Sequence, residues 1–325
     1  MRITDILVDR ATGLLRIQTD EKHEGWCPDV PPEAAEPLVE RFSSMLCDQD
    51  PIDRERLWST ATDIDKRYSA PLRGYVDVAL WDLAAKNVGL PLYRYISGFR
   101  NRIPACNRGV EELDGEPVVQ EARRAQRDGF PAYKITCDLS VERLLWLIPE
   151  VRQWVGEDFC LILEGNQSFT LRDAITVGRC LDAANGFLFE RVRPAGDFSG
   201  IRQVASAIDT PVAIDVSTLT EAAQTFALEA ADSLRTSISA GVGITDALKM
   251  ARCAEAFGAH IHLAGQGIAA GFAHAHLLGA IRNAPFFEAE ENGIVPCCTN
   301  IRNPLHVENG HLTLPGGPGL GIELE

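Results

Sequence analysis

The pattern of apolar and polar residues divides the chain into three regions. Residues 1–30 alternate between the two kinds, as in RITDILV and GLLRIQT, which predicts two or three strands of an antiparallel meander. From Glu33 to Asn87 the apolar residues recur at helical spacing, and the last helix of this region is expected to end at Gly89 and Pro91.

From Ile103 onward, short apolar runs alternate with longer amphipathic stretches. The eight runs are RIPACNRG, PAYKITCD, DFCLILEGN, GFLFERV, TPVAIDVS, DSLRTSIS, AHIHLAG and PFFEAE. Strands separated by helical patterns such as EPVVQEARRAQRDG predict βα repetition and a closed parallel α/β barrel. After about Asn292 the chain is rich in Gly and Pro and irregular, and we expect a tail that returns to the first domain.

Three acidic residues stand at the ends of three successive runs: Glu164, Glu190 and Asp215, spaced by 26 and 25 residues. This spacing matches one strand plus one helix, so the three carboxylates should reach the same end of the barrel. Active sites of such barrels lie at the C-terminal ends of the strands. Converging carboxylates repel one another unless a cation lies among them, and ligation by oxygen alone suits Mg²⁺. The sequence therefore predicts a magnesium site.

Composition narrows the class of partner. The 325 residues carry a formal net charge of −15, which argues against nucleic acid because binding phosphates needs clustered Lys and Arg. No apolar run is long enough to span a membrane, and we expect MRITDILVDR to form a strand and not an export segment. The nine cysteines form no CxxC pair, which favours reduced thiols in the cytoplasm and argues against zinc.

Three segments resemble the enolase superfamily, in the branch of mandelate racemase and muconate-lactonizing enzymes. VDVALWDLAAKNVGLPLYRYISG is similar to the last helix of that branch's capping domain, EGNQSF to its first metal-ligand segment, and NPLHVENGHLTLPGGPGLGIELE to its C-terminal tail. The resemblance implies a modified TIM-type (β/α)7β barrel with an α+β capping domain built from both chain ends. We expect the capping domain at residues 1–102, the barrel at 103–292 and the returning tail at 293–325.

The resemblance also implies Mg²⁺ and chemistry that begins by removing a proton α to a carboxylate. A bound divalent ion stabilises the enediolate that forms. Glu164, Glu190 and Asp215 match the family's three ligands by position, although Glu164 stands where Asp is more usual. Asn166 lies two residues after Glu164, faces the same way, and is expected to support the site by hydrogen bonding.

The acid–base groups depart from the family pattern. Where many relatives carry Lys-x-Lys at the end of the second barrel strand, this chain has Lys134 and Thr136. The resemblance gives Lys134 a contact with the substrate carboxylate, and Thr136 cannot act as a base. Ser237 stands where relatives have a Lys or an Asp at the end of the sixth strand. By these positions we expect Thr136 and Ser237, like Lys134 and Asn166, to contact the substrate.

The seventh and eighth strands supply further candidates. Alignment from either side puts the family's histidine position at His262 or Ala264, which share one face, so His262 is the best candidate base; a core histidine is the alternative. His260 has the same parity and should lie deeper. Glu288 matches a glutamate that hydrogen-bonds the substrate carboxylate, a role that requires burial to raise its pKa.

The family's mobile lid is expected to be missing, because only about Ala11-Thr12-Gly13 joins the first two strands. The pocket is then expected either to be more open or to be sealed by something else, such as a neighbouring subunit or the segment around Trp58–Arg67.

Three functions remain open. A Mg²⁺-dependent dehydratase of a hydroxy or sugar acid needs one base, His262 or Lys134. A racemase or epimerase normally needs two bases on opposite faces, and Thr136 and Ser237 count against it; a cycloisomerase belongs to the same alternative. A catalytically reduced barrel that only binds a carboxylate is the third. We expect a small carboxylate ligand, no nucleic acid, no membrane, and a homo-oligomer.

Overall fold

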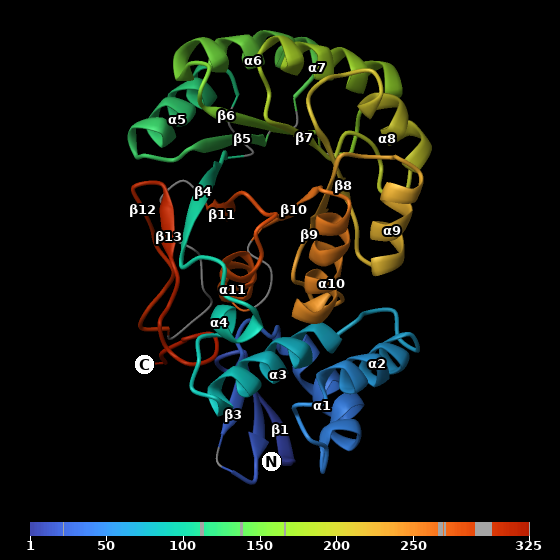
Figure 1. The fold of residues 1–325 in the computed structure, drawn as a ribbon, viewed down its shortest axis with the longest axis vertical. Coiled ribbons are helices and arrows are strands. Elements are labelled where there is room, and N and C mark those ends of the chain that lie inside the picture. Colours follow the sequence, from blue (N-terminus) through green and yellow to red (C-terminus); the bar gives the residue numbers. More distant parts are fainter. Residues whose placement is uncertain are drawn as a thin grey trace.

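The molecule consists of an N-terminal part and a barrel (Figure 1). The computed structural model describes residues 1–21, 23–110, 114–136, 139–165, 167–265, 269, 271–289 and 301–324. In Figure 1 the N-terminal segments lie at one end of the long axis, and a ring of strands with its outer helices occupies the other. Among the described residues, no helix is both long enough and apolar enough to cross a lipid bilayer.

The N-terminal strands form the predicted antiparallel meander. They are β1 (Ile3–Asp9), β2 (Leu14–Thr19) and β3 (Glu24–Cys27), paired in that order. The turn between β1 and β2 is tight: Gly13 has a φ of 65°, and its N–H donates to the carbonyl of Asp9 at 2.8 Å. The first two strands are therefore joined without a long loop, as the sequence predicts.

The predicted helical region contains α1 (Pro32–Leu46), α2 (Arg54–Asp65) and α3 (Arg73–Asn87), followed by the short α4 (Leu92–Ile96). Helix α3 is buried from Gly74 to Ala85 because it packs against β3 on one side and a barrel helix on another. A helix that is buried all round carries apolar residues on every face, which explains why VDVALWDLAA is apolar except at Asp77 and Asp82. Both carboxylates accept hydrogen bonds, from Thr245 and from Leu320 respectively.

All eight predicted barrel strands are present. They are β4 (Arg102–Arg108), β5 (Ala132–Thr136), β6 (Cys160–Glu164), β7 (Leu188–Glu190), β8 (Val212–Asp215), β9 (Ser233–Thr236), β10 (His260–Leu263) and β11 (Phe287–Ala289). Strands β4 to β10 pair in chain order, all in parallel, and β11 pairs with β4. The outer helices are α5 (Glu116–Arg127), α6 (Val141–Val155), α7 (Leu171–Ala183), α8 (Phe198–Ala205), α9 (Leu219–Ala227), α10 (Gly243–Ala256) and α11 (Phe272–Ala280). The fold is the modified TIM-type barrel with a capping domain.

The barrel interior changes from apolar to charged along its axis. Near the N-terminal ends of the strands, one buried cluster contains Cys106, Ala132, Ile162, Leu188 and Ala213. Side chains two positions later on a strand face the same way. On β5 to β8 these later positions are Lys134, Glu164, Glu190 and Asp215. The sequence therefore places a charged layer above an apolar floor.

The N-terminal helices dock where β9 ends. The indole N–H of Trp58 donates to Asp246 at 2.8 Å, and that of Trp81 donates to Thr245 at 2.9 Å. The backbone N–H of Gly74 donates to the carbonyl of Ala240 at 2.8 Å, with no room for a Cβ beside Ser239. These contacts hold α2 and α3 against the start of α10, at the C-terminal end of the barrel.

The tail returns to both parts of the molecule. It contains a short hairpin, β12 (Val307–Glu308) and β13 (His311–Thr313), whose second strand pairs antiparallel with β4. The tail, expected to be irregular, therefore contains one short hairpin. Further on, the backbone N–H of Leu320 donates to Asp82 of α3 at 2.7 Å. The expected boundary at residues 292 and 293 lies outside the described residues.

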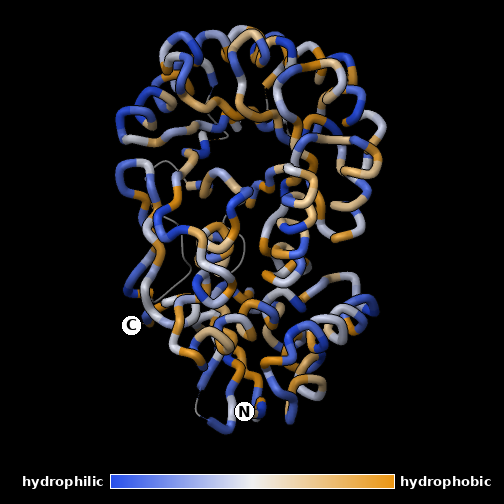
Figure 2. Tube along the Cα trace, in the orientation of Figure 1, coloured by the Kyte–Doolittle hydropathy of each residue, from blue (hydrophilic) through white to orange (hydrophobic). Residues whose placement is uncertain are grey.

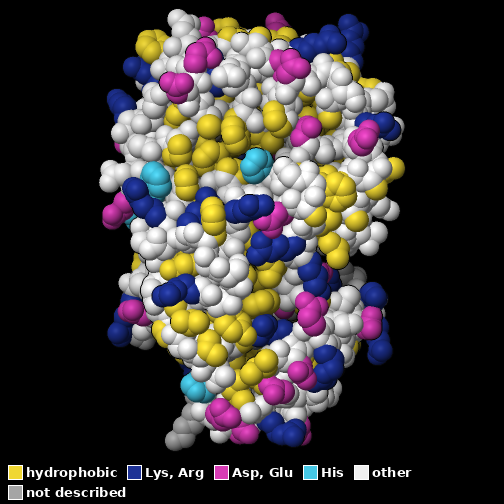
Figure 3. Space-filling model, in the orientation of Figure 1, with side chains coloured by type: hydrophobic (Ala, Val, Ile, Leu, Met, Phe, Trp, Pro, Cys, Tyr) yellow, Lys and Arg dark blue, Asp and Glu magenta, His cyan; other side chains and the backbone are white. Residues whose placement is uncertain are grey.

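The distribution of polarity follows this architecture. Figure 2 shows hydrophobic stretches along the barrel strands and hydrophilic residues on the outward turns of the helices. On the face drawn in Figure 3, apolar side chains gather over the middle of the barrel, while charged residues of both signs are dispersed over the helices and the N-terminal part. On this face the acidic residues are therefore dispersed and do not form one patch.

Candidate active site

The three predicted carboxylates lie together at the C-terminal end of the barrel. Glu164 and Glu190 are register partners on β6 and β7, and both are buried. Asp215 ends β8 and is a register partner of Arg235 on β9. One side chain, that of Arg235, is within ion-pair distance of all three carboxylates. We refer to Glu164, Glu190 and Asp215 as the acidic trio.

Each nitrogen of the Arg235 guanidinium faces a different member of the acidic trio. Nη1 lies 2.7 Å from Asp215 Oδ1, Nε lies 3.3 Å from Glu190 Oε2, and Nη2 lies 3.7 Å from Glu164 Oε1. The side chain is 14% exposed. Burial alone would lower the pKa of Arg235, but the surrounding carboxylates, Glu190 first, raise it above the ordinary value. The guanidinium is therefore a fixed positive charge among the three acids.

A second guanidinium, that of Arg191, reaches the same carboxylates from the end of β7. Its Nη1 lies 2.6 Å from Glu164 Oε1 and its Nε lies 3.5 Å from Asp215 Oδ2. Arg191 has a φ of 53°, in the left-handed region that few residues other than Gly adopt. Its carbonyl accepts a hydrogen bond at 2.8 Å from the N–H of Gln167, whose own φ is 61°. Strained backbone of this kind is typical of functional sites.

Lys134 joins the cluster from β5. It is fully buried; its Nζ lies 2.6 Å from Glu190 Oε2 and hydrogen-bonds Glu288. Burial alone would lower the pKa of Lys134, but these two carboxylates raise it above the ordinary lysine value. A lysine held protonated in this way is not a free amine. The interpretation of Lys134 as a candidate base does not fit its surroundings.

Glu288 of β11 is the fourth carboxylate of the cluster. Its second oxygen accepts a hydrogen bond at 2.7 Å from the N–H of Gly265. Burial alone would raise its pKa, but Lys134, Arg235 and these hydrogen bonds outweigh burial and hold the pKa of Glu288 at about 2. The donor role proposed for Glu288 requires a raised pKa, and this lowered pKa does not support it. The contact with Lys134 leaves no sign in the sequence.

His262 is buried on β10, where it is the register partner of Arg235. Burial lowers the pKa of His262 to about 3, and the positive charge of Lys134 adds to the effect. The imidazole is therefore neutral at neutral pH. Its ring makes no hydrogen bond to another described residue. His260 does not lie deeper as expected: it is exposed, because β10 begins there at the opposite end of the barrel.

The remaining candidates lie around this cluster or outside the described residues. The Thr136 hydroxyl is buried and donates to the carbonyl of Gly109, so it is already used by the protein. Ser237 follows the last residue of β9 and is partly exposed. Asn166 lies outside the described residues. The roles of Thr136, Ser237 and Asn166 in substrate binding stay predictions.

The carboxylates do not fit a divalent ion in this arrangement. Mg²⁺ requires oxygen ligands at about 2.1 Å in near-octahedral geometry. The Arg235 guanidinium lies among the same three carboxylates, and two cations would repel each other there. Among the residues that the structure describes, no group of three or more His, Cys, Asp or Glu side chains is placed to hold a metal ion. Metal ligation by the acidic trio therefore stays a prediction that this arrangement of side chains does not favour.

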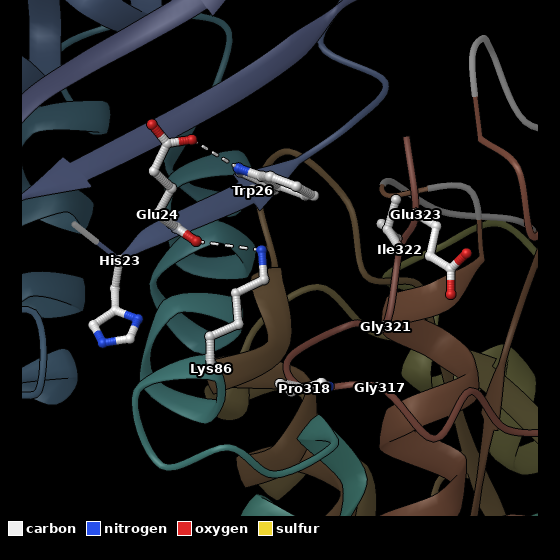
Figure 4. Close-up of a pocket in the computed structure, with 9 residues that line it drawn as sticks. All are labelled: His23, Glu24, Trp26, Lys86, Gly317, Pro318, Gly321, Ile322 and Glu323. Atoms are coloured by element: carbon white, nitrogen blue, oxygen red, sulfur yellow. Dashed lines mark hydrogen bonds between the residues drawn. The ribbon is translucent and has the colours of Figure 1, made fainter. Parts of the chain in front are cut away.

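A separate pocket lies away from this cluster, between the N-terminal part and the tail (Figure 4). Its volume is about 530 Å³. Figure 4 shows Trp26 and Lys86 on one side and the tail segment with Glu323 on the other. The Lys86 ammonium lies 3.7 Å from the centre of the Trp26 ring and 2.6 Å from Asp82. The Lys86–Trp26 contact joins α3 to β3, and the N–H of Leu320 that donates to Asp82 joins the tail to α3.

Residues 117–325 match a family model described as enolase C-terminal domain-like. The match covers well over half of the chain. The chain belongs to the enolase superfamily. The assignment confirms the resemblance drawn from the capping helix, the EGNQSF segment and the tail, including the branch of mandelate racemase and muconate-lactonizing enzymes.

Curated members of the superfamily that resemble this chain catalyse several reactions. D-galactarolactone cycloisomerase of Agrobacterium fabrum is 29% identical, with 97% of this chain and 89% of that protein covered. Arabinonate dehydratase of Saccharolobus solfataricus is 25% identical, with 90% and 82% covered. Among solved structures, D-glucarate dehydratase from Agrobacterium tumefaciens, complexed with magnesium, has a TM-score of 0.84 at 24% identity and covers 99% of this chain and 94% of that one. The structural likeness shows the enolase-superfamily fold.

Sequence reasoning missed Arg191 and Arg235. Arg235 lies two residues before Ser237, on the same face of the strand, and is a charged residue inside a short strand run. Its position on the same strand face as Ser237 could have indicated that Arg235 points into the site. Arg191 directly follows Glu190, but in an ordinary strand it would point to the opposite face. Only its left-handed backbone turns the side chain back toward the acidic trio.

Proposed function

We propose that this member of the enolase superfamily removes the proton α to the carboxylate of a small hydroxy or sugar acid and eliminates the β-hydroxyl as water. The observation that carries the proposal is the position of His262: a neutral, buried imidazole next to Arg235, at the barrel end where the charged cluster lies. Family membership supports the same chemistry, since the relatives named above include a dehydratase and a cycloisomerase of sugar acids.

His262 would act as both base and acid. The unprotonated ring nitrogen takes the α-proton, and the C–H electron pair moves toward the substrate carboxylate to give an enediolate. The imidazolium then returns a proton to the β-hydroxyl as the C–O bond breaks, and the enol product tautomerises to a 2-keto acid. One group suffices for both transfers because they occur in sequence.

The cations of the cluster would stabilise the negative charge that develops. Arg191 is 30% exposed, more than Arg235 or Lys134, so it is the cation best placed to meet the substrate carboxylate. Fixed positive charge in a site that excludes water lowers the energy of an enediolate. Magnesium held by the acidic trio would supply Lewis-acid stabilisation, but guanidinium groups lie between those carboxylates, so every step here uses the chain's own residues. A cytoplasmic location and a homo-oligomeric state belong to the same proposal.

A carboxylate-binding barrel without catalysis is the second candidate. The favouring observation is that Lys134, the surviving lysine of the family's Lys-x-Lys pattern, is ion-paired with Glu190 and Glu288. With Thr136 and Ser237 at the other base positions, His262 is the remaining candidate base. A racemase needs a base on each face of the substrate, so this arrangement supports it less.

Proton NMR in D₂O with a library of hydroxy, sugar and amino acids tests the proposal. We expect loss of the α-proton signal and appearance of a keto acid with the wild-type protein, and neither with His262→Asn. His260→Asn is the matched control, because His260 lies on the same strand at the opposite end of the barrel. Saturable carboxylate binding with no exchange for any compound would instead establish the second candidate.

A further inference from the structure

We propose that the guanidinium of Arg235 takes the place of the divalent cation in this barrel, so that the acidic trio is neutralised by the protein itself and binds no metal. The inference concerns the cation of the site described above. The catalytic use of the Arg235 charge rests on the proposed function. The absence of metal from the acidic trio does not, because metal binding can be measured without turnover.

The first observation is the pairing of three nitrogens with three carboxylates. The distances of 2.7, 3.3 and 3.7 Å join a different nitrogen of Arg235 to Asp215, Glu190 and Glu164 respectively. Three acids from three strands thus converge on one planar cation, and that cation comes from the next strand. The register of β8 with β9 makes Asp215 and Arg235 neighbours, and this pairing places the guanidinium among the three acids.

The second observation is the strained backbone at Arg191. A φ of 53° is unfavourable for an arginine, yet it brings the side chain to 2.6 Å from Glu164 and 3.5 Å from Asp215. The hydrogen bond from Gln167 to the Arg191 carbonyl fixes the turn, and the Gln167 side chain donates to Asp215 at 2.9 Å. A second cation is therefore held over the same acids by a conformation that costs energy.

The third observation is the balance of charge. The cluster contains four carboxylates, those of the acidic trio and Glu288, and three cations, which are Lys134, Arg191 and Arg235. Adding a divalent cation without removing an arginine would leave an excess of positive charge in a buried site. With the arginines in place, the cluster carries one uncompensated negative charge, which is less than the charge of a divalent ion.

A tethered guanidinium differs from a bound ion in ways that can be measured. It remains protonated at every pH at which proteins fold, and a chelator cannot remove it. It offers directed hydrogen bonds in one plane and no open coordination position. A substrate carboxylate would therefore be held by hydrogen bonds and charge, and this chain would keep its activity in EDTA.

Electron paramagnetic resonance of Mn²⁺, used as the probe for a divalent ion, tests the inference. We expect no bound Mn²⁺ with the wild-type protein at millimolar ion and no change of Tm on adding MgCl₂. Arg235→Met removes the cation and keeps the aliphatic stem, so this variant should bind Mn²⁺. Its Tm should rise by about 5 °C at saturating MgCl₂. Arg193→Gln is the matched control: Arg193 pairs with Asp197, 2.7 Å away, and should behave like the wild type.

Wild-type protein that binds Mn²⁺ and loses that binding in Asp215→Asn would overturn the inference. This measurement needs only the wild type and a mild variant, so it stands even if Arg235→Met does not fold. Arg235→Gln then provides a smaller perturbation with the same expected gain of ion binding. If the wild type binds no Mn²⁺ and no acid undergoes α-proton exchange, the proposed function fails. The inference that Arg235 takes the place of the metal ion then still holds.

Discussion

His262 and Arg235 are register partners on the parallel strands β10 and β9, so a neutral imidazole and a guanidinium face the barrel interior as neighbours. Lys134 adds further positive potential at the imidazole. A proton on His262 in the empty site would therefore be expelled by both burial and like charge. A substrate carboxylate would change that balance, since it brings a negative charge to the place where the imidazolium forms.

The stability of the protein should fall in acid partly through His262. Its pKa is about 3 when folded and 6.5 ordinarily, so the unfolded chain binds the proton more readily between these values. The free energy of unfolding then decreases as the pH falls from about 6.5 toward 3. When the pH falls from 6.5 to 5, the free energy of unfolding should decrease by about 1–2 kcal/mol less in His262→Asn than in the wild type. Urea unfolding at the two pH values measures this difference. If the free energy of unfolding depends on pH in the same way in both proteins, His262 is not held neutral in the folded state.

Removing the Arg235 charge should destabilise the fold. The substitution Arg235→Met leaves the acidic trio without its shared cation, and breaking a buried ion pair from one side costs about 3–5 kcal/mol. Urea unfolding at pH 7 without added metal measures this loss. Arg193→Gln, which breaks the pair with Asp197, should cost about 1 kcal/mol or less. Equal losses for the two variants would show that the trio does not depend on Arg235.

Lys134 and Glu288 should be energetically coupled. Lys134→Met leaves Glu190 and Glu288 without their buried cation, whereas Glu288→Gln removes one of the two acids. In the double variant the second substitution should cost less than it does alone, by about 0.5–3 kcal/mol. A double-mutant cycle of unfolding free energies gives this coupling directly, and strict additivity would mean that the pair contributes nothing.

The sequence could predict the barrel because its signals are local. Each of the eight strand runs is short, apolar and separated from the next by a helical pattern, and all eight appear as strands. Convergence of Glu164, Glu190 and Asp215 followed from equal spacing alone. Equal spacing places residues at one barrel end in any fold of this class.

The electrostatic state of the site could not be predicted in the same way. The pKa of Glu288 depends on Lys134, which is 154 residues away in the chain. Burial alone would raise the pKa of Glu288, whereas the contact with Lys134 lowers it. Arg191 reaches the trio through a left-handed turn that is fixed by a hydrogen bond from Gln167. Neither contact leaves a periodic signal, because both arise only when separate strands meet.

The last prediction concerns the binding of substrate by Arg191. Asn tolerates the left-handed backbone that Arg191 adopts, so Arg191→Asn removes the cation without straining the turn. A hydrogen bond to a charged group contributes about 1.5–3 kcal/mol, so KM for the acid that the exchange assay identifies should rise about 10–100-fold.

The split between KM and kcat distinguishes the roles of the two arginines. If Arg191 binds the substrate carboxylate equally in the ground and transition states, kcat should change little while KM rises. The variant Arg191→Gly keeps the turn and also lacks the cation, so it should match Arg191→Asn. A fall in kcat with unchanged KM in both variants would mean that Arg191 acts on the enediolate and not on the bound acid, which would move the contact with the substrate carboxylate to another cation of the cluster.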